Sequence, residues 1–114
     1  MPKQKIILKG IGASPGKVQG EVKIVNFPRE IERLKGDKII VSSFLTPDFL
    51  AIVRKNQNIL GIITDKGGRT CHAAIVAREQ GIPYIAGAIN ATKLLKKNIM
   101  INMNGEKGTI YEIG

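Results

Sequence analysis

Short apolar runs separated by glycine, proline and asparagine recur along the chain. The runs are rich in valine and isoleucine and long enough to cross a sheet once, which is typical of β-strands. They cover residues 5–8, 18–25, 38–41, 60–64, 84–86, 100–103 and 109–113. The last two runs are separated by a short glycine-containing connection, so a hairpin is expected there. Strands therefore outnumber helices in the predicted fold.

The clearest helical pattern spans residues 47–54. Thr46 precedes it as an expected N-cap, and Pro47 occupies a first-turn position that tolerates proline. The apolar residues recur at helical spacing, so one side of this helix should pack against the core. These residues are Phe49, Leu50, Ile52 and Val53.

A second helix is expected over residues 71–80. Thr70 precedes it as a predicted N-cap, and Gly81 followed by Pro83 ends it. The apolar residues at 73–77 cover every direction around the helix axis, so we expect burial along much of its length. Several short strands packed with two main helices predict an α/β fold. No repeat or linker-like run interrupts the chain, so we expect one domain over residues 1–114.

Composition limits the chemistry that the chain can perform. One cysteine and one histidine among 114 residues can form neither an internal disulfide nor a four-ligand zinc site. A chain of this length suits one domain and leaves no room for two substrate-binding lobes around a cleft. The apolar runs fall short of the roughly 20 residues of a membrane span, and no signal-peptide pattern is evident. We therefore expect a soluble, cytoplasmic protein with no membrane partner.

An excess of positive charge raises the question of a nucleic-acid partner. Eighteen lysine and arginine residues against nine acidic residues leave a formal net charge of +9. The basic residues are scattered, with Lys93, Lys96 and Lys97 as the tightest group, and no ladder of aromatic side chains accompanies them. We therefore expect no dedicated nucleic-acid site. A positive field equally attracts an acidic partner protein or a phosphorylated small molecule.

Most of the candidate functional groups lie in residues 64–72, a segment that runs from a strand end through a double-glycine turn to a helix start. Gly67 and Gly68 can adopt positive φ and let the backbone approach a ligand closely. The free amides and the dipole of the helix N-terminus then form an anion site beside His72, the only histidine. Arg69 adds a forked donor that suits phosphate oxygens.

His72 in this position favours phosphoryl chemistry. A histidine in water is largely neutral at pH 7, so one ring nitrogen keeps a lone pair that can attack phosphorus. The helix amides and Arg69 would stabilise the charge of the attached group. Other chemistries fit less well, because Cys71 and His72 point about 100° apart on a helix. The spacings of the known nucleotide-binding glycine loops are also absent.

Residues 67–79, with the sequence GGRTCHAAIVARE, are followed by a Gly-Ile-Pro triplet at 81–83 and by Gly87. This segment resembles the signature of the mobile phosphohistidine domain of PEP-utilising enzymes. Phosphoenolpyruvate synthase is the most similar of these enzymes, with pyruvate phosphate dikinase and enzyme I of the sugar phosphotransferase system further off. Upstream, the GASPG sequence at 12–16, with Gly20 and Val22, resembles the opening motif of that domain. The resemblance covers nearly the whole chain.

The resemblance implies a swivelling β/β/α domain that moves between an ATP-grasp domain and a PEP/pyruvate-binding barrel domain. His72 matches the phosphorylated histidine, which would take a phosphoryl group from ATP and pass it to pyruvate to give phosphoenolpyruvate. ATP and Mg²⁺ would bind at the partner domains or chains, so this chain is expected to hold no metal or cofactor. The chain would then be a phosphotransferase component that is incomplete alone.

Thr70 has two interpretations. As an N-cap, its hydroxyl would satisfy a free helix amide, which contributes about 1 kcal/mol. In the family, the matching threonine is the site at which regulatory kinases inactivate pyruvate phosphate dikinase and phosphoenolpyruvate synthase, which makes Thr70 a candidate regulatory phosphosite. We also assign it, with Gly67, Gly68 and Arg69, to the residues that stabilise phosphate.

A second hypothesis belongs to a different class of function. The chain could be a free-standing interaction or regulatory module that keeps the fold without complete transfer activity and binds a partner through its basic surface. The joint presence of His72, the glycine pair and Arg69 favours the carrier, because a module freed from the chemistry has no need of all of them.

Overall fold

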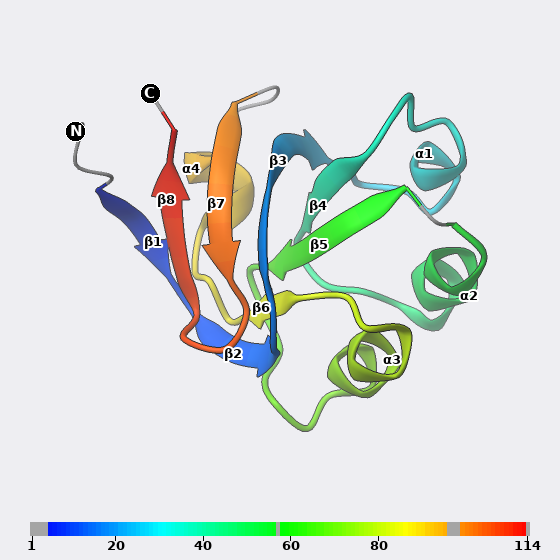
Figure 1. Cartoon of the computed structure of the whole chain (residues 1–114). Coiled ribbons are helices and arrows are strands. Elements are labelled where there is room, and N and C mark those ends of the chain that lie inside the picture. Colours follow the sequence, from blue (N-terminus) through cyan, green and yellow to red (C-terminus); the bar gives the residue numbers. More distant parts are fainter. Residues whose placement is uncertain (1–4, 57, 96–98, 114) are drawn as a thin grey trace.

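The computed structural model describes residues 5–56, 58–95 and 99–113 (Figure 1). In this part of the chain the strands are Ile6–Lys9 (β1), Ile11–Ser14 (β2), Lys17–Ile24 (β3), Lys38–Ser42 (β4), Ile59–Thr64 (β5), Tyr84–Ala86 (β6), Met100–Asn104 (β7) and Thr109–Glu112 (β8). The helices are Arg29–Glu32 (α1), Pro47–Lys55 (α2), His72–Gln80 (α3) and Ala91–Leu94 (α4). No helix in these ranges is long and apolar enough to cross a bilayer.

All of these strands belong to one mixed sheet in the order β1-β8-β7-β3-β4-β5-β6-β2. The strands from β3 to β6 run parallel to one another. The pairs of β1 with β8, β8 with β7, β7 with β3 and β2 with β6 are antiparallel. The predicted α/β class is confirmed, as are the predicted strand runs, the β7–β8 hairpin and the two main helices.

The sequence pattern misses three elements: β2, α1 and α4. β2 has the sequence IGAS and lacks the β-branched alternation that marks a strand. α1 and α4 have four residues each, which is too short to display a helical period. Of the basic group that the sequence suggests, Lys93 lies in α4 and is exposed, whereas Lys96 and Lys97 lie outside the described residues.

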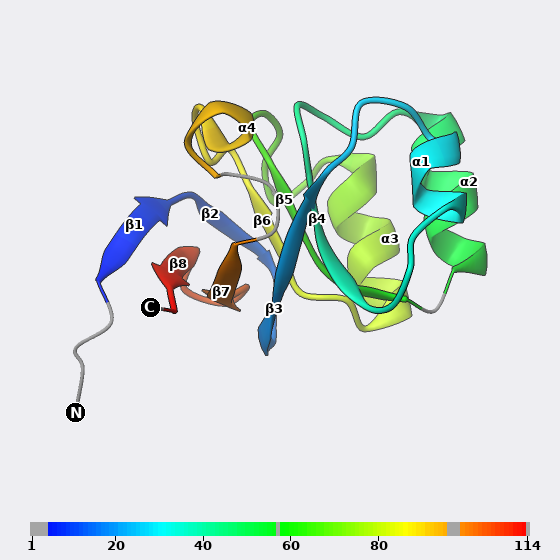
Figure 2. The ribbon, with the colours of Figure 1, turned by 90° about the horizontal axis from the view of Figure 1, so that it is seen from above.

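Helices α1, α2 and α3 cover one face of the parallel strands (Figure 2). Each helix joins two neighbouring parallel strands, and right-handed crossovers bring successive helices to the same face. The predicted inner side of α2 is confirmed, with Phe49, Leu50 and Val53 buried and Ile52 half-buried. The layer between these helices and the sheet forms the first core.

The sheet closes on itself because one bent segment pairs with both of its ends. β1 and β2 are separated only by Gly10, yet β1 pairs with β8 and β2 pairs with β6. The amide of Gly10 donates to the carbonyl oxygen of Gly108 at 2.8 Å. A Cβ at Gly108 would overlap the carbonyl group of Gly10, which belongs to the facing backbone. The bend therefore requires two backbones to approach more closely than a side chain allows.

Closure encloses a second core on the inner face of the sheet. Its members include Val22, Ile39, Val41, Ile63, Ile85, Ile101, Met103 and Ile110, and α4 adds Ala91. Neighbouring residues of β4 face opposite cores, since Ile39 belongs to the inner core and Ile40 to the helix-side core. Burial on both faces explains the unbroken apolar runs of the central strands. The layers are those of the expected β/β/α arrangement, with α1, α2 and α3 as the helical layer.

We expect Gly108→Ala to destabilise the protein more than Gly36→Ala. Both glycines have positive φ, +74° and +80°, so both substitutions carry a backbone cost of about 1 kcal/mol. Only Gly108 faces backbone at the closure, whereas a Cβ at Gly36 meets nothing within 4 Å. Urea denaturation should show an additional loss of about 2 kcal/mol or more for Gly108→Ala. Equal losses for the two variants would contradict the closure argument.

Candidate functional site

The loop between β5 and α3 lies at the carboxyl edge of the parallel strands, where the loops after β4 and β6 also lie. Backbone hydrogen bonds join these loops: the amide of Asp65 donates to Ser42 O at 3.1 Å, and the amide of Lys66 donates to Ser43 O at 3.0 Å. On the other side, the amide of Ala88 donates to Thr64 O at 2.9 Å. The crevice outside the carboxyl ends of parallel strands is where such sheets place ligands.

Two hydroxyl groups support the start of this loop from below. Thr64 Oγ1 donates to Lys66 O at 2.6 Å and lies 2.7 Å from the hydroxyl oxygen of Tyr84. Because the single proton of Thr64 is used on Lys66 O, the phenol of Tyr84 is the donor in the second bond. Burial raises the pKa of the Tyr84 phenol well above its usual value, so this donor stays protonated.

The two glycines of the loop have different roles. Gly67 has φ +106°, a conformation that favours glycine, and a Cβ there would lie 3.3 Å from the Tyr84 hydroxyl. Gly68 does not have positive φ, and a Cβ there would meet nothing within 4 Å. Of the two glycines that can adopt positive φ, only Gly67 does so in this structure. Its carbonyl accepts a hydrogen bond from the Cys71 amide at 3.4 Å.

Helix α3 begins one residue later than predicted. Cys71 is the N-cap, with extended φ and ψ of −69° and 157°, and no side chain caps the helix. The predicted N-cap role of Thr70 is therefore wrong, because Thr70 lies in the exposed turn before the cap. The Cys71 carbonyl accepts from the amides of Ala74 and Ile75 at 3.0 and 3.3 Å. The thiol instead lies 4.0 Å from the Tyr84 hydroxyl.

This start leaves backbone donors available next to the histidine. The amides of His72 and Ala73 have no hydrogen-bond partner within the described ranges. They lie at the positive end of the α3 dipole, where an anion is stabilised. His72 is the first residue of α3, and its side chain is exposed and makes no hydrogen bond or ion pair to another described residue. The arrangement suits an anionic group attached to or approaching the imidazole.

Helix α3 is buried on one side only. Ala73, Ala74, Val76 and Ala77 are buried, but Ile75 is 44% exposed. The expectation of burial around much of the helix is therefore wrong at Ile75, one turn beyond His72, because only the sheet and α2 cover α3. The exposed side of the first turns carries both His72 and Ile75.

Arg78 links α3 to two other segments. Its Nε donates to Ala13 O in β2 at 2.8 Å, and its Nη2 donates to Arg69 O in the loop. Arg69 itself is exposed, and with Arg78 it lines an open cavity of about 290 Å³ beside β2. The sequence places Arg69 beside the anion site, but it gives no sign that Arg78 anchors the loop.

The only carboxylate of the 64–72 segment is also held. Asp65 accepts hydrogen bonds from the amide and the hydroxyl of Thr92 at 2.9 and 2.6 Å. Across the described ranges no three histidine, cysteine or acidic side chains are grouped so that they could hold a metal ion.

The family model of the mobile domain of PEP-utilising enzymes matches residues 34–108, which include the whole loop and α3. The chain belongs to this family. The match confirms the resemblance carried by residues 67–79 and places His72 within the matched region.

The mobile-domain chain is similar to archaeal phosphoenolpyruvate synthases. It is 44% identical over 108 residues to a probable phosphoenolpyruvate synthase of Archaeoglobus fulgidus, which covers 95% of this chain and 14% of the relative. It is 41% identical over 108 residues to the phosphoenolpyruvate synthase of Pyrococcus furiosus, covering 95% of this chain and 13% of the relative. The chain therefore spans about a seventh of the length of these relatives.

Solved structures share the mobile-domain fold. A solution structure of Enzyme I (nEIt) superimposes with a TM-score of 0.62 at 34% identity, covering 70% of this chain and 32% of that one. Holo-form aconitase X of Thermococcus kodakaraensis superimposes with a TM-score of 0.68 at 20% identity, covering 94% of this chain and 98% of that chain. The second likeness shows the fold alone.

We expect Tyr84 to make stability depend on alkaline pH. Because burial raises its pKa, the unfolded chain loses the phenolic proton at lower pH than the folded chain. The stabilisation is therefore complete below about pH 10 and is lost above it, by up to about 1.4 kcal/mol per pH unit. Urea denaturation of the wild type and Tyr84→Phe should show their difference in unfolding free energy falling above about pH 10. A difference independent of pH would contradict the burial of a neutral phenol.

Proposed function

We propose that this mobile domain is a phosphoryl carrier in which His72 is the acceptor and donor. The observation that carries the proposal is the position of His72. The only histidine of the chain is exposed at the first residue of α3, beside amides without partners, in a domain of the PEP-utilising family. Exposure lets the imidazole reach a donor and an acceptor, while the amides stay fixed to the fold.

The chemical step needs a lone pair and stabilisation of negative charge. A ring nitrogen of neutral His72 forms a bond to phosphorus, while the phosphorus–oxygen bond of the donor breaks and its electron pair stays on the departing oxygen. The amides of His72 and Ala73, and the guanidinium of Arg69, stabilise the transferred group. In the second step a base of the pyruvate-binding unit removes a methyl proton, and the resulting enolate oxygen of pyruvate forms a bond to phosphorus. The nitrogen–phosphorus bond breaks with its electron pair returning to the ring, which gives phosphoenolpyruvate and restores the free imidazole.

The partners in this proposal are an ATP-grasp unit that binds ATP with Mg²⁺ and a barrel unit that binds pyruvate. The support is the length of the relatives, since the chain spans only 13% to 14% of the two phosphoenolpyruvate synthases described above. Sites for nucleotide and pyruvate then belong to other parts of such proteins. The described residues of this chain contribute the carrier histidine and its anion site, and they have no cluster of metal ligands.

Replacing the histidine tests the proposal directly. The wild-type chain, incubated with Mg²⁺, labelled ATP and the ATP-grasp portion of the Archaeoglobus fulgidus relative, should gain one phosphoryl group that is labile to acid and stable to base. His72→Ala should gain none, and its unfolding free energy should change by less than about 0.5 kcal/mol because the side chain is exposed. Label that persists on His72→Ala would end the proposal, and a wild type that never takes label would favour the interaction module.

We further propose that phosphorylation of Thr70 blocks transfer. Thr70 is exposed two residues before His72, so a phosphate there places negative charge next to the incoming phosphoryl group. Thr70→Asp should lower the transfer rate at least about tenfold, an effect of about 1.4 kcal/mol on the barrier. Thr70→Asn is the matched control, because its side chain has the shape of aspartate without the charge, and it should retain more transfer than Thr70→Asp. Unchanged transfer in Thr70→Asp would count against regulation at this residue.

A further inference from the structure

The hydroxyl of Tyr84 lies beneath three parts of the His72 loop. It is 2.7 Å from Thr64 Oγ1 at the end of β5 and 4.0 Å from Cys71 Sγ at the N-cap of α3. Between these two, it is the nearest atom to a Cβ built on Gly67, at 3.3 Å. One buried oxygen atom on β6 therefore contacts the beginning, the middle and the end of the segment that leads to His72.

The hydrogen bond that Thr64 donates fixes the peptide group between Lys66 and Gly67. Thr64 Oγ1 donates to Lys66 O, and the amide of Gly87 approaches the same oxygen at 3.4 Å. The carbonyl of Lys66 shares its peptide plane with the nitrogen of Gly67. Its orientation therefore sets the plane from which the unusual φ of Gly67, +106°, is measured. The bonds of Tyr84 and Thr64 thus help to hold the loop in a conformation that residues other than glycine rarely adopt.

The alternatives to this support within the loop are few. The side chains of Arg69, Thr70 and His72 are exposed, and the α3 start has no side-chain cap. The Asp65 carboxylate is bound to Thr92 in α4 and not to the glycine turn. Arg78 holds the loop further along, at Arg69 O. Beside the backbone bonds of Lys66, whose amide donates to Ser43 O and whose carbonyl accepts from the Gly87 amide, the turn at Gly67 is held from the interior by the hydroxyls of Tyr84 and Thr64.

We propose that Tyr84 is a positioning residue for phosphoryl transfer at His72, acting through Thr64 and the carbonyl of Lys66. The inference rests on the proposed carrier function and adds a residue to it. Tyr84 itself touches neither the imidazole nor the transferred group. It places the amides of the α3 N-terminus relative to the imidazole by fixing the loop that precedes them. Because burial raises the pKa of the Tyr84 phenol, this hydroxyl keeps the proton that it donates to Thr64 Oγ1.

The experiment uses the whole 114-residue chain and potassium phosphoramidate, a small phosphoryl donor that requires no partner protein. A ring nitrogen of His72 forms the new nitrogen–phosphorus bond, and ammonia leaves with the electron pair of the broken one. The first readout is the rate of phosphorylation, followed by intact mass. The second is the set of backbone amide resonances of Gly67, Cys71 and His72, which reports loop geometry whether or not His72 reacts.

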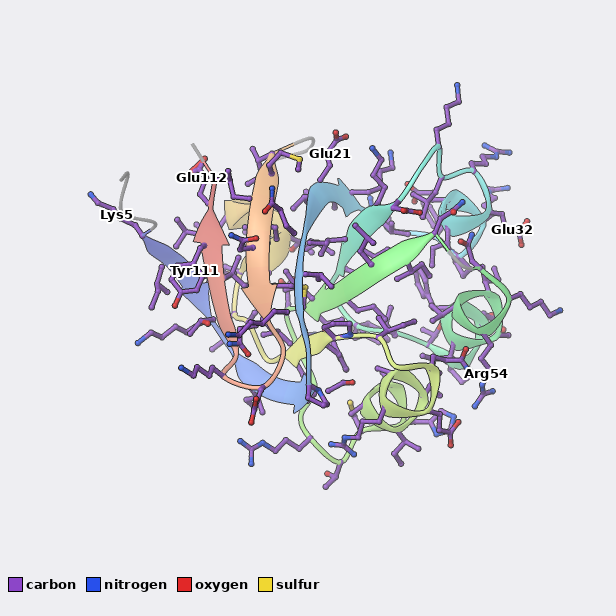
Figure 3. All side chains as sticks on the ribbon, viewed as in Figure 1. Lys5, Glu21, Glu32, Arg54, Tyr111 and Glu112 are labelled. Atoms are coloured by element: carbon purple, nitrogen blue, oxygen red, sulfur yellow. The ribbon has the colours of Figure 1, made fainter. Side chains whose placement is uncertain are left out.

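The variants separate the effect of the hydroxyl relay, the hydrogen bonds from Tyr84 to Thr64 and from Thr64 to Lys66 O, from an effect on general stability. Tyr84→Phe and Thr64→Val each remove one hydroxyl with little change of shape, and Thr64→Ser restores the relay. Tyr111→Phe is the matched control, because Tyr111 lies on β8, away from α3 (Figure 3). We expect Tyr84→Phe and Thr64→Val to slow phosphorylation about tenfold each and to shift the loop amides, with no further loss when combined. Thr64→Ser and Tyr111→Phe should match the wild type.

The outcomes that overturn the inference are distinct from those that overturn the carrier function. Loop amides of Tyr84→Phe that stay at their wild-type positions would overturn the positioning role even in a chain that reacts with no donor. Shifted amides with a wild-type rate would also overturn it, since the hydroxyl would then be structural only. A wild-type chain that phosphoramidate does not modify at His72 speaks against the carrier function, and the amide readout still decides whether Tyr84 sets the loop.

Discussion

The pairing of one bent segment with both ends of the sheet is the constraint on which the rest of this structure depends. β1 and β2 follow each other directly, so the ends of the sheet at β8 and β6 must come within one residue, Gly10, of each other. Closure joins the two end strands of the sheet, β1 and β2, into one segment that pairs with β8 and with β6. It also encloses the inner apolar face, whose side chains would otherwise meet water.

The same closure positions the candidate site. The strand that receives β2 is β6, which carries Tyr84, and β2 itself offers Ala13 O to the guanidinium of Arg78 in α3. The other arm of that guanidinium holds Arg69 O in the loop. The helix with His72, the loop before it and the closing strand are thus joined by one side chain. A substitution at the closure should therefore alter the loop conformation through β6 and Arg78, although β2, β6 and α3 lie in different segments of the sequence.

The parts of this fold that depend on neighbours in sequence could be predicted, and those that depend on distant pairs could not. Apolar runs and the proline and glycine signals suffice for most strands and for α2 and α3, and the motif around His72 shows the family. The sequence predicts Thr70 as the N-cap because threonine is a preferred capping residue and cysteine is not, whereas the backbone conformation places the N-cap at Cys71. Gly67 differs from Gly68 in its positive φ and in the side chains packed around it, which come from Tyr84, Cys71 and Ala86. Tyr84 has no local signal, since a tyrosine at a strand start is ordinary.

In the proposed carrier role, the histidine must satisfy two opposing demands. It has to be exposed and free of protein partners, because it meets separate donors and acceptors, and His72 is exposed accordingly. The amides that stabilise its phosphoryl group have to be fixed, and a surface loop with two glycines does not fix them by itself. A carboxylate beneath the loop would add repulsion toward phosphate, and the one present, Asp65, is held by Thr92. A buried, neutral phenol satisfies both demands, because it orders the backbone without competing for the imidazole or repelling the transferred group.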